Sequence, residues 1–143
     1  MSARVIITEG PLPPQPPQPP QGGAEAADSS TGAVGVVGVV GAVLVFDGIV
    51  RRNEDGKPLE ALDYTAYEPM AQNQIGAICD ELIASLGLTS IVVEHSRGRV
   101  PVGACSFRLT ITSPHRKEAL RACDEFIDRL KQDVPIWKEP VWA

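Results

Sequence analysis

Two apolar stripes at helical spacing constrain the fold of this chain more than any other feature. The first stripe follows Pro69, and the second follows the pair Ser113-Pro114. Their members are Ile75, Ile78, Cys79, Leu82, Ile83 and Leu86, and then Ala119, Ala122, Cys123, Phe126, Ile127 and Leu130. Steps of three and four residues place each set on one side of a helix, which must bury that side against another layer. We therefore predict two helices, one ended by Gly87 and the other ended before Pro135.

The remaining ordered segments have the composition of β-strands. Strands are expected at residues 3–8, 41–50, 59–67, 90–95 and 104–112, with a turn over residues 96–103. Apolar and polar residues alternate along the last strand. This alternation predicts that Cys105, Phe107, Leu109 and Ile111 point inward and that Ser106, Arg108 and Thr110 point outward. The sequence therefore predicts an α+β fold with two helices packed on one largely antiparallel sheet.

The N-terminal part divides the chain into three regions. Residues 1–10 hold a strand candidate, residues 11–31 form a proline-rich and polar linker, and residues 32–143 form the folded domain. Proline fixes φ and lacks an N–H donor, so the linker cannot join a helix or a central strand, and we expect it to be flexible. The Gly-Val repeat over residues 32–40 is expected to be an edge strand or a loop.

Charge and composition exclude several classes of protein. The net charge of -5 and the pI near 5.0 argue against nucleic-acid binding, which requires a basic face. The longest uncharged apolar stretch, residues 32–46, is too short and too rich in glycine for a membrane span, and no secretory signal is visible. The three cysteines form no C-x-x-C pair and fall on apolar faces, which is typical of a cytoplasmic protein.

The start of the second predicted helix is a candidate anion site. Ser113 is a good N-cap residue, and Pro114 suits the first helical position. The free N–H groups of a helix start attract phosphate or carboxylate, and His115 and Arg116 would add an imidazole and a guanidinium there. The alternative is a capped helix with a solvated arginine and a surface histidine.

Two lysines near the C-terminus form a second candidate. Lys131 falls in the last turn of the predicted helix, where the helix dipole alone would explain a cation. However, the segment 134–137 has to fold the chain back, and this would bring Lys138 near Lys131. Two ammonium groups held close together depress each other's pKa, and a neutral lysine is a nucleophile or a base.

The other polar candidates carry weaker signals. Arg51 and Arg52 follow a hydrophobic strand and are either a solvated strand end or bidentate ligands for phosphate. His95 lies on a predicted strand, where a structural role is more typical. The chain has no P-loop and no G-x-G-x-x-G motif, and its two histidines do not make a metal-ligand cluster. We therefore expect neither a metal nor a cofactor.

Five motifs occur in a fixed order along the chain. They are G-A-V-L-V-F-D-G-I-V-R, Y-T-A-Y-E-P-M-A, H-S-R-G-R-V-P-V-G, T-S-P-H-R and L-K-Q-D-V-P-I-W-K-E. Between residues 41 and 139 this order resembles the large, catalytic subunit of molybdopterin synthase. The resemblance implies an α/β-hammerhead fold and a homodimer that binds a small ubiquitin-like subunit at each end, which makes a heterotetramer. It also implies sulfur transfer from the C-terminal Gly-Gly thiocarboxylate of that subunit to cyclic pyranopterin monophosphate, forming the dithiolene of molybdopterin.

The resemblance also implies roles for individual residues. The active-site lysines of the family fall on Lys131 and Lys138, its pocket arginine on Arg51, its His-Arg pair on His115 and Arg116, and an aromatic position near the pocket on Phe46. The arginines and the histidine would hold the phosphate of the pterin. Lys131 would attack or polarise the carbonyl of the donor, and Lys138 would neutralise charge and assist proton transfer.

Three features depart from the family pattern. The N-terminal segment is unusually rich in proline, glycine and valine, Arg52-Asn53 replaces a common His-Asn, and the chain ends at Ala143 soon after the W-K-E motif. These departures leave two alternatives open. One is a protein of the same fold that binds the partner but has lost turnover through its short tail. The other is a ferredoxin-like module that binds a small anionic ligand at S-P-H-R.

Overall fold

The computed structural model describes residues 2–14 and 38–143. The strands are β1 (Ser2–Glu9), β2 (Ala42–Ile49), β3 (Asn53–Glu54), β4 (Lys57–Ala66), β5 (Ser90–Pro101), β6 (Cys105–Ser113) and β7 (Ile136–Trp142), and the helices are α2 (Met70–Leu86) and α3 (Arg116–Asp133). Most of the predicted linker, and residues 32–37 of the Gly-Val repeat, lie outside the described residues.

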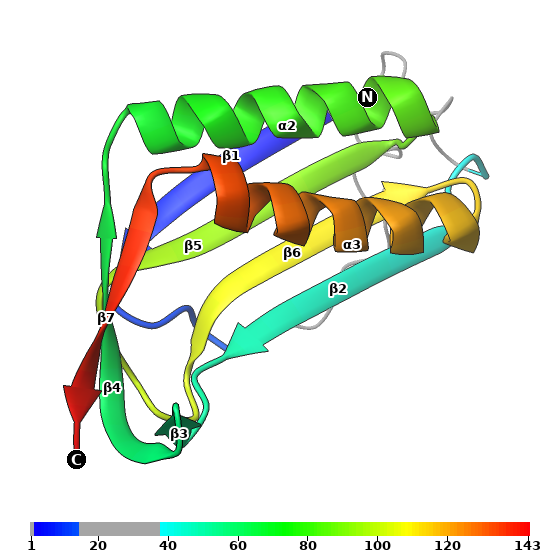
Figure 1. The fold of residues 1–143 in the computed structure, drawn as a ribbon. Helices are drawn as coiled ribbons and strands as arrows, with labels where there is room; N and C mark the ends of the chain where they lie inside the picture. The colour runs from blue at the N-terminus through cyan, green and yellow to red at the C-terminus, as the bar shows by residue number, and fades with distance from the viewer. Residues whose placement is uncertain (1, 15–37) are drawn as a thin grey trace.

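The strands form one sheet with the order β2-β6-β5-β4-β3, in which β1 also pairs with β5 and β7 also pairs with β4 (Figure 1). The pairing of β1 with β5 is parallel, and the other strand pairs are antiparallel. β5 is long enough to have different neighbours along its length. Its first part lies beside β1 and β6, and Gly98–Pro101 lies beside β4. The predicted α+β fold with a largely antiparallel sheet is confirmed.

Both helices lie on the same side of the sheet (Figure 1). Apart from Ala71, their buried side chains belong to the predicted stripes, namely Ile75, Ile78, Cys79, Leu82 and Ile83 of α2 and Ala119, Ala122 and Phe126 of α3. They pack against Ile91, Val93, Leu109 and Ile111 of the central strands. Complete burial of one such Ile, Leu or Phe side chain contributes about 1.5–3 kcal/mol, so this layer is the main source of stability. Gly87 ends α2 in the left-handed conformation, as predicted.

The segment that follows β1 covers part of the opposite face of the sheet. The Leu12 N–H donates to the Cys105 carbonyl at 2.9 Å, and the Arg108 guanidinium donates to the Pro13 carbonyl at 2.8 Å and to Asp47 at 2.6 Å. Arg108 alternates with core residues of β6 as predicted, but only 3% of it is exposed. The expectation that it faces solvent is wrong, because a remote segment folds over it.

Three local predictions also require correction. The predicted turn over residues 96–103 is confined to residues 102–103, because β5 continues through Pro101 with β1 and then β4 as partners. Ser113 is not the cap of the second helix. It ends β6, and α3 begins at Arg116 with His115 in the capping position. The segment after Pro135 is a strand, because its backbone pairs with the free edge of β4.

Neither helix in the described part combines the length and the apolarity needed to cross a membrane.

Candidate functional site

A cavity of about 660 Å³ opens where α3 ends above the lower part of the sheet. Its walls come from six places in the sequence: the end of β2 with the hairpin that follows, β4, the middle of β5, the start of β6, the last turns of α3, and the start of β7. The cavity exists because β7 folds back along β4, so that the chain after α3 closes one side of it. We call it the basic pocket, after the side chains that line it.

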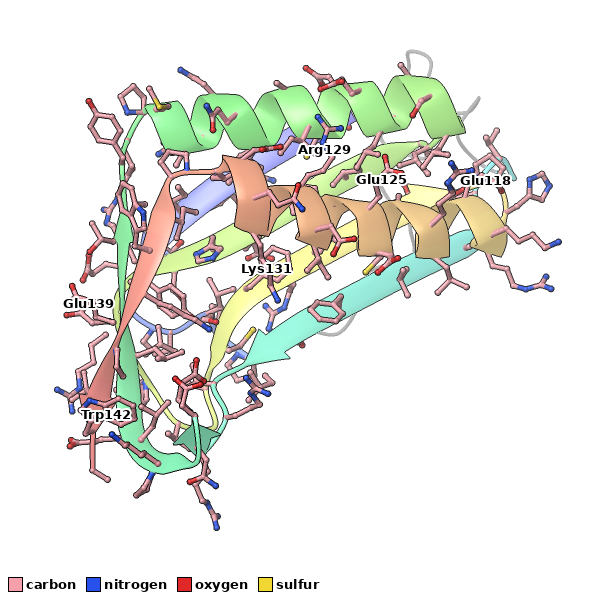
Figure 2. All side chains as sticks on the ribbon, in the orientation of Figure 1. Glu118, Glu125, Arg129, Lys131, Glu139 and Trp142 are labelled. Atoms are coloured by element: carbon pink, nitrogen blue, oxygen red, sulfur yellow. The ribbon has the colours of Figure 1, made fainter. Side chains whose placement is uncertain are left out.

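Three cationic side chains line the basic pocket, although they are far apart in the sequence. Arg51 follows β2, Lys131 lies in the last turn of α3, and Lys138 is on β7. In Figure 2 the Lys131 side chain extends from α3 toward the strands. Phe46, the fourth residue that the family resemblance placed here, lines the same cavity. The tertiary structure thus brings together four of the six predicted site residues.

A carboxylate lies between two of these cations. One oxygen of Glu54 is 3.5 Å from Lys138 Nζ, and the other is 3.6 Å from a terminal nitrogen of Arg51. The hypothesis of an isolated pair of ammonium groups therefore needs revision, since Lys138 has an acidic partner inside the pocket. Asp47 also lines the cavity, but it is engaged by Arg108. The three cations in the lining therefore outnumber its carboxylates, and the pocket has positive charge available for an anionic ligand.

A tight hairpin positions Glu54. β3 pairs antiparallel with β4, with Glu54 opposite Lys57, and Asp55 and Gly56 form the two-residue connection. Both connecting residues have positive φ, at 51° and 77°, which is the requirement of a type I′ turn and explains the Asp-Gly sequence. Sequence reasoning missed Glu54. The Asp-Gly pair could have predicted the hairpin, but nothing in the sequence predicts the contact of Glu54 with Lys138.

The floor of the basic pocket is aromatic. Ring centroids are 6.0 Å apart for Phe46 and Phe107, 5.8 Å for Phe107 and His95, and 5.3 Å for His95 and Tyr64. The Tyr64 hydroxyl lies 3.0 Å from the Ser106 hydroxyl. These rings are tilted or edge-on to one another, and they offer a planar heterocycle both faces and edges, contacts from which aromatic groups gain beyond the area that they bury.

His95 is the second residue of the pocket that sequence reasoning undervalued. It is buried, as expected of a structural histidine, but it also lines the cavity. Its Nδ1 lies 2.7 Å from the Ser96 carbonyl oxygen. Burial lowers the pKa of His95 below its ordinary value, because the charged imidazolium loses solvation.

His115 and Arg116 lie at the other end of α3. They line a separate cavity of about 450 Å³ together with Gly41, Pro114, Lys117 and Glu118. Fifteen residues of helix at 1.5 Å per residue put Arg116 about 22 Å from Lys131. In Figure 2, Glu118 and Lys131 mark these two ends of α3. Within one chain, the structure does not place the His-Arg pair in the basic pocket.

The cysteines pack in the core or beside it. Cys79 and Cys105 are buried, and Cys123 is half-buried. Burial raises the pKa of all three thiols, that of Cys79 to about 12, which disfavours the reactive thiolate. In residues 2–14 and 38–143 no three His, Cys, Asp or Glu side chains gather as metal ligands.

Comparison with known proteins assigns a family to this fold. The model of the MoaE protein family matches residues 24–133. Among curated relatives, the molybdopterin synthase catalytic subunit of Nostoc sp. is 43% identical over 102 residues, 71% of this chain and 62% of that protein. The human molybdopterin synthase catalytic subunit is 39% identical over 101 residues, 71% of this chain and 54% of that protein. The chain thus spans between half and two thirds of the length of these relatives.

Solved structures give the same result. The crystal structure of molybdopterin synthase from Staphylococcus aureus superposes with a TM-score of 0.75 at 32% identity, covering 96% of this chain and 90% of that one. The complex of subunits 1 and 2 of the molybdopterin-converting factor from Helicobacter pylori superposes with a TM-score of 0.67 at 26% identity, covering 97% and 89%. Sequence and fold agree, and the chain belongs to the MoaE protein family.

Proposed function

We propose that this protein is the catalytic subunit of a molybdopterin synthase. It transfers sulfur from the C-terminal thiocarboxylate of a small ubiquitin-like subunit to cyclic pyranopterin monophosphate and so forms the dithiolene of molybdopterin. The observation that carries the proposal is the convergence of Arg51, Lys131 and Lys138 around one cavity with an aromatic floor. Both reactants are anions, and the acceptor contains a planar ring system.

The pocket matches these reactants in charge and in shape. Guanidinium and ammonium groups bind phosphate and thiocarboxylate through charge-assisted hydrogen bonds, which are stronger than neutral ones. Arg51 is well placed for the pterin phosphate because 79% of its side chain is exposed at the rim. Phe46, with its ring next to Phe107, offers a contact surface for the pterin.

The two lysines take the chemical roles. Lys131 attacks or polarises the terminal carbonyl of the donor, and Lys138 neutralises the charge that develops during sulfur attack. Lys138 also exchanges its contact with Glu54 for one with the substrate, so that Glu54 acts as a counter-ion that the substrate displaces. No metal and no organic cofactor is needed for this chemistry.

A second copy of the chain completes the substrate site. His115 and Arg116 lie about 22 Å along α3 from Lys131, farther than a single pterin phosphate reaches. If both ends of α3 serve one substrate, they belong to two different chains. A homodimer with twofold symmetry would then contain two equivalent composite sites. With one small subunit per site, the assembly is a heterotetramer acting in the cytoplasm.

The test is a reconstituted reaction. The protein is mixed with thiocarboxylated small subunit and cyclic pyranopterin monophosphate, and the dithiolene product and the co-eluting complex are measured. Lys131→Ala should lower the rate by about 10²–10³-fold, as the loss of one transition-state contact does. The matched control is Lys57→Ala, because Lys57 lies over the Trp142 ring and does not line the basic pocket. Near-normal dithiolene formation by Lys131→Ala would contradict the proposed role of this lysine.

A further inference from the structure

His95 is held in one orientation at the floor of the basic pocket. It is 6% exposed, and the Tyr64 ring meets it edge-on at 79° with centroids 5.3 Å apart. Phe107 lies on another side at 5.8 Å and is itself stacked on the buried Phe126. The ring therefore has little freedom to rotate, although part of it borders the cavity.

The contact with Ser96 decides which nitrogen can accept a proton. A carbonyl oxygen only accepts hydrogen bonds, so at 2.7 Å the His95 Nδ1 must be the donor. The neutral ring then carries its proton on Nδ1 and a lone pair on Nε2. Since Nδ1 is directed at the backbone of β5, Nε2 is the nitrogen left to face the pocket.

The surroundings keep His95 neutral. Burial lowers its pKa, and the contact with Ser96 only partly opposes this effect. The charged and titratable groups that share the cavity lining are Lys131 from α3, Lys138 from β7, Arg51 and Glu54 from the β2–β4 connection, Asp47 from β2 and Tyr64 from β4. Asp47 is paired with Arg108, and Glu54 with Arg51 and Lys138. Among the described residues that line the pocket, no carboxylate is left to stabilise an imidazolium, and the remaining positive charge disfavours it.

We propose that His95 is the proton acceptor of the basic pocket and takes a proton from the water that replaces sulfur on the donor. This proposal rests on the proposed function. A thiocarboxylate that gives its sulfur to a carbon of the pterin first forms a thioester between donor and pterin. The donor must leave as a carboxylate, and the oxygen that it gains comes from water.

The atoms of this step balance. The water oxygen bonds to the thioester carbonyl carbon, and His95 Nε2 takes one of its protons. The carbon–sulfur bond then breaks, its electron pair stays on sulfur, and His95 passes the proton to that sulfur to give a thiol. The second water proton remains on the new carboxylic acid and is lost to solvent. Lys131, in its polarising role, stabilises the carbonyl oxygen during the addition.

The test uses His95→Asn in the complete reaction with thiocarboxylated small subunit. The asparagine amide can still donate to the Ser96 carbonyl, but it cannot accept a proton. The rate of dithiolene formation should fall by about 10²–10⁴-fold while co-elution with the small subunit is unchanged. The thioester adduct of donor and pterin should accumulate and be visible by mass spectrometry, and added imidazole should restore part of the rate. Arg99→Gln, on the exposed side of the same strand, is the matched control and should retain the wild-type rate.

A merely structural role for His95 would give neither adduct accumulation nor rescue by imidazole. Loss of a proton acceptor should lower the rate by at least about 10²-fold. If a folded His95→Asn protein instead keeps a rate within about threefold of wild type, the role of His95 is overturned but the proposed function is not. The wild-type protein provides a test that does not depend on a variant. Because burial lowers the pKa of His95, the rate should fall only on the acid side of the ordinary histidine range, and a profile without such a fall while the protein stays folded would also overturn the proposal. A wild-type chain that forms no dithiolene would overturn the proposed function together with this inference.

Discussion

Lys138 of β7 lies 3.5 Å from Glu54 of β3, in a pocket that Arg51 and Lys131 also line. The two residues come together because β4 pairs with both strands, with β3 near its start and with β7 along most of its length. The same carboxylate is 3.6 Å from Arg51. Glu54 therefore offsets the charge of two cations as long as the pocket holds no anionic ligand.

Removing this carboxylate should strengthen anion binding. Glu54→Gln keeps the shape of the side chain and releases Arg51 and Lys138, and exposed ion pairs of this kind are worth about 0.2–1 kcal/mol each. We expect cyclic pyranopterin monophosphate to bind about two- to fivefold more tightly, with a larger effect at low salt because screening is weaker there. Isothermal titration calorimetry at two ionic strengths measures this. Glu60→Gln, which removes the exposed partner of Arg99, is the control and should leave the affinity unchanged.

Mixing two inactive variants tests the composite site. Lys131→Ala and Arg116→Ala should each be inactive alone, but a dimer of one copy of each has one intact site if the two residues act across the interface. After subunit exchange, the mixture should regain roughly a quarter of wild-type activity for random pairing of two copies. Lys131→Ala mixed with Lys138→Ala is the control, because these lysines line the same pocket and no intact site can form. Equal failure of both mixtures would contradict the proposed dimer site.

The packing beneath the pocket floor should be costly to disturb. Phe126 is fully buried, and its ring is stacked on that of Phe107 with centroids 6.1 Å apart. Phe126→Ala should lower the free energy of unfolding by about 3–5 kcal/mol, since it leaves a cavity in the core. Urea unfolding measures the change. Leu120→Ala on the same helix removes a side chain that is 55% exposed and should change stability by about 0.5 kcal/mol or less.

The buried state of His95 should make the fold sensitive to acid. Its pKa in the folded protein is lowered by burial, whereas in the unfolded chain it is near 6.5. As the pH falls below about 6.5, the unfolded state therefore binds more protons than the folded state, and stability declines until the folded-state pKa is passed. Urea unfolding at a series of pH values should show this loss in the wild type and a smaller one in His95→Asn. Parallel curves for the two proteins would contradict the sign of the shift.

The sequence by itself determined the layers of the fold. The stripe from Ile75 to Ile83 and the alternation from Cys105 to Ile111 report burial on one side of a helix or strand, and that is a local periodicity. The helix stripe was confirmed, and so was the burial of the inward residues of the strand, because an element that buries one face must show it in its own residues. The burial of Ser106 and Arg108 on the other face was not predicted. The position of Lys131 in the last turn of α3 was available from the same pattern.

Only the tertiary structure decided which polar side chains meet. Local patterns contain no information on strand order, so they could not place β7 on β4, Glu54 beside Lys138, or the Pro13 carbonyl over Arg108. The separation of the His115–Arg116 pair from Lys131, in contrast, follows from their positions at opposite ends of one predicted helix. Apolar burial is a property of each element alone. A site depends on the contacts between elements. The residues that balance its charges come from distant parts of the sequence, and their positions in the sequence do not predict which side chains they contact.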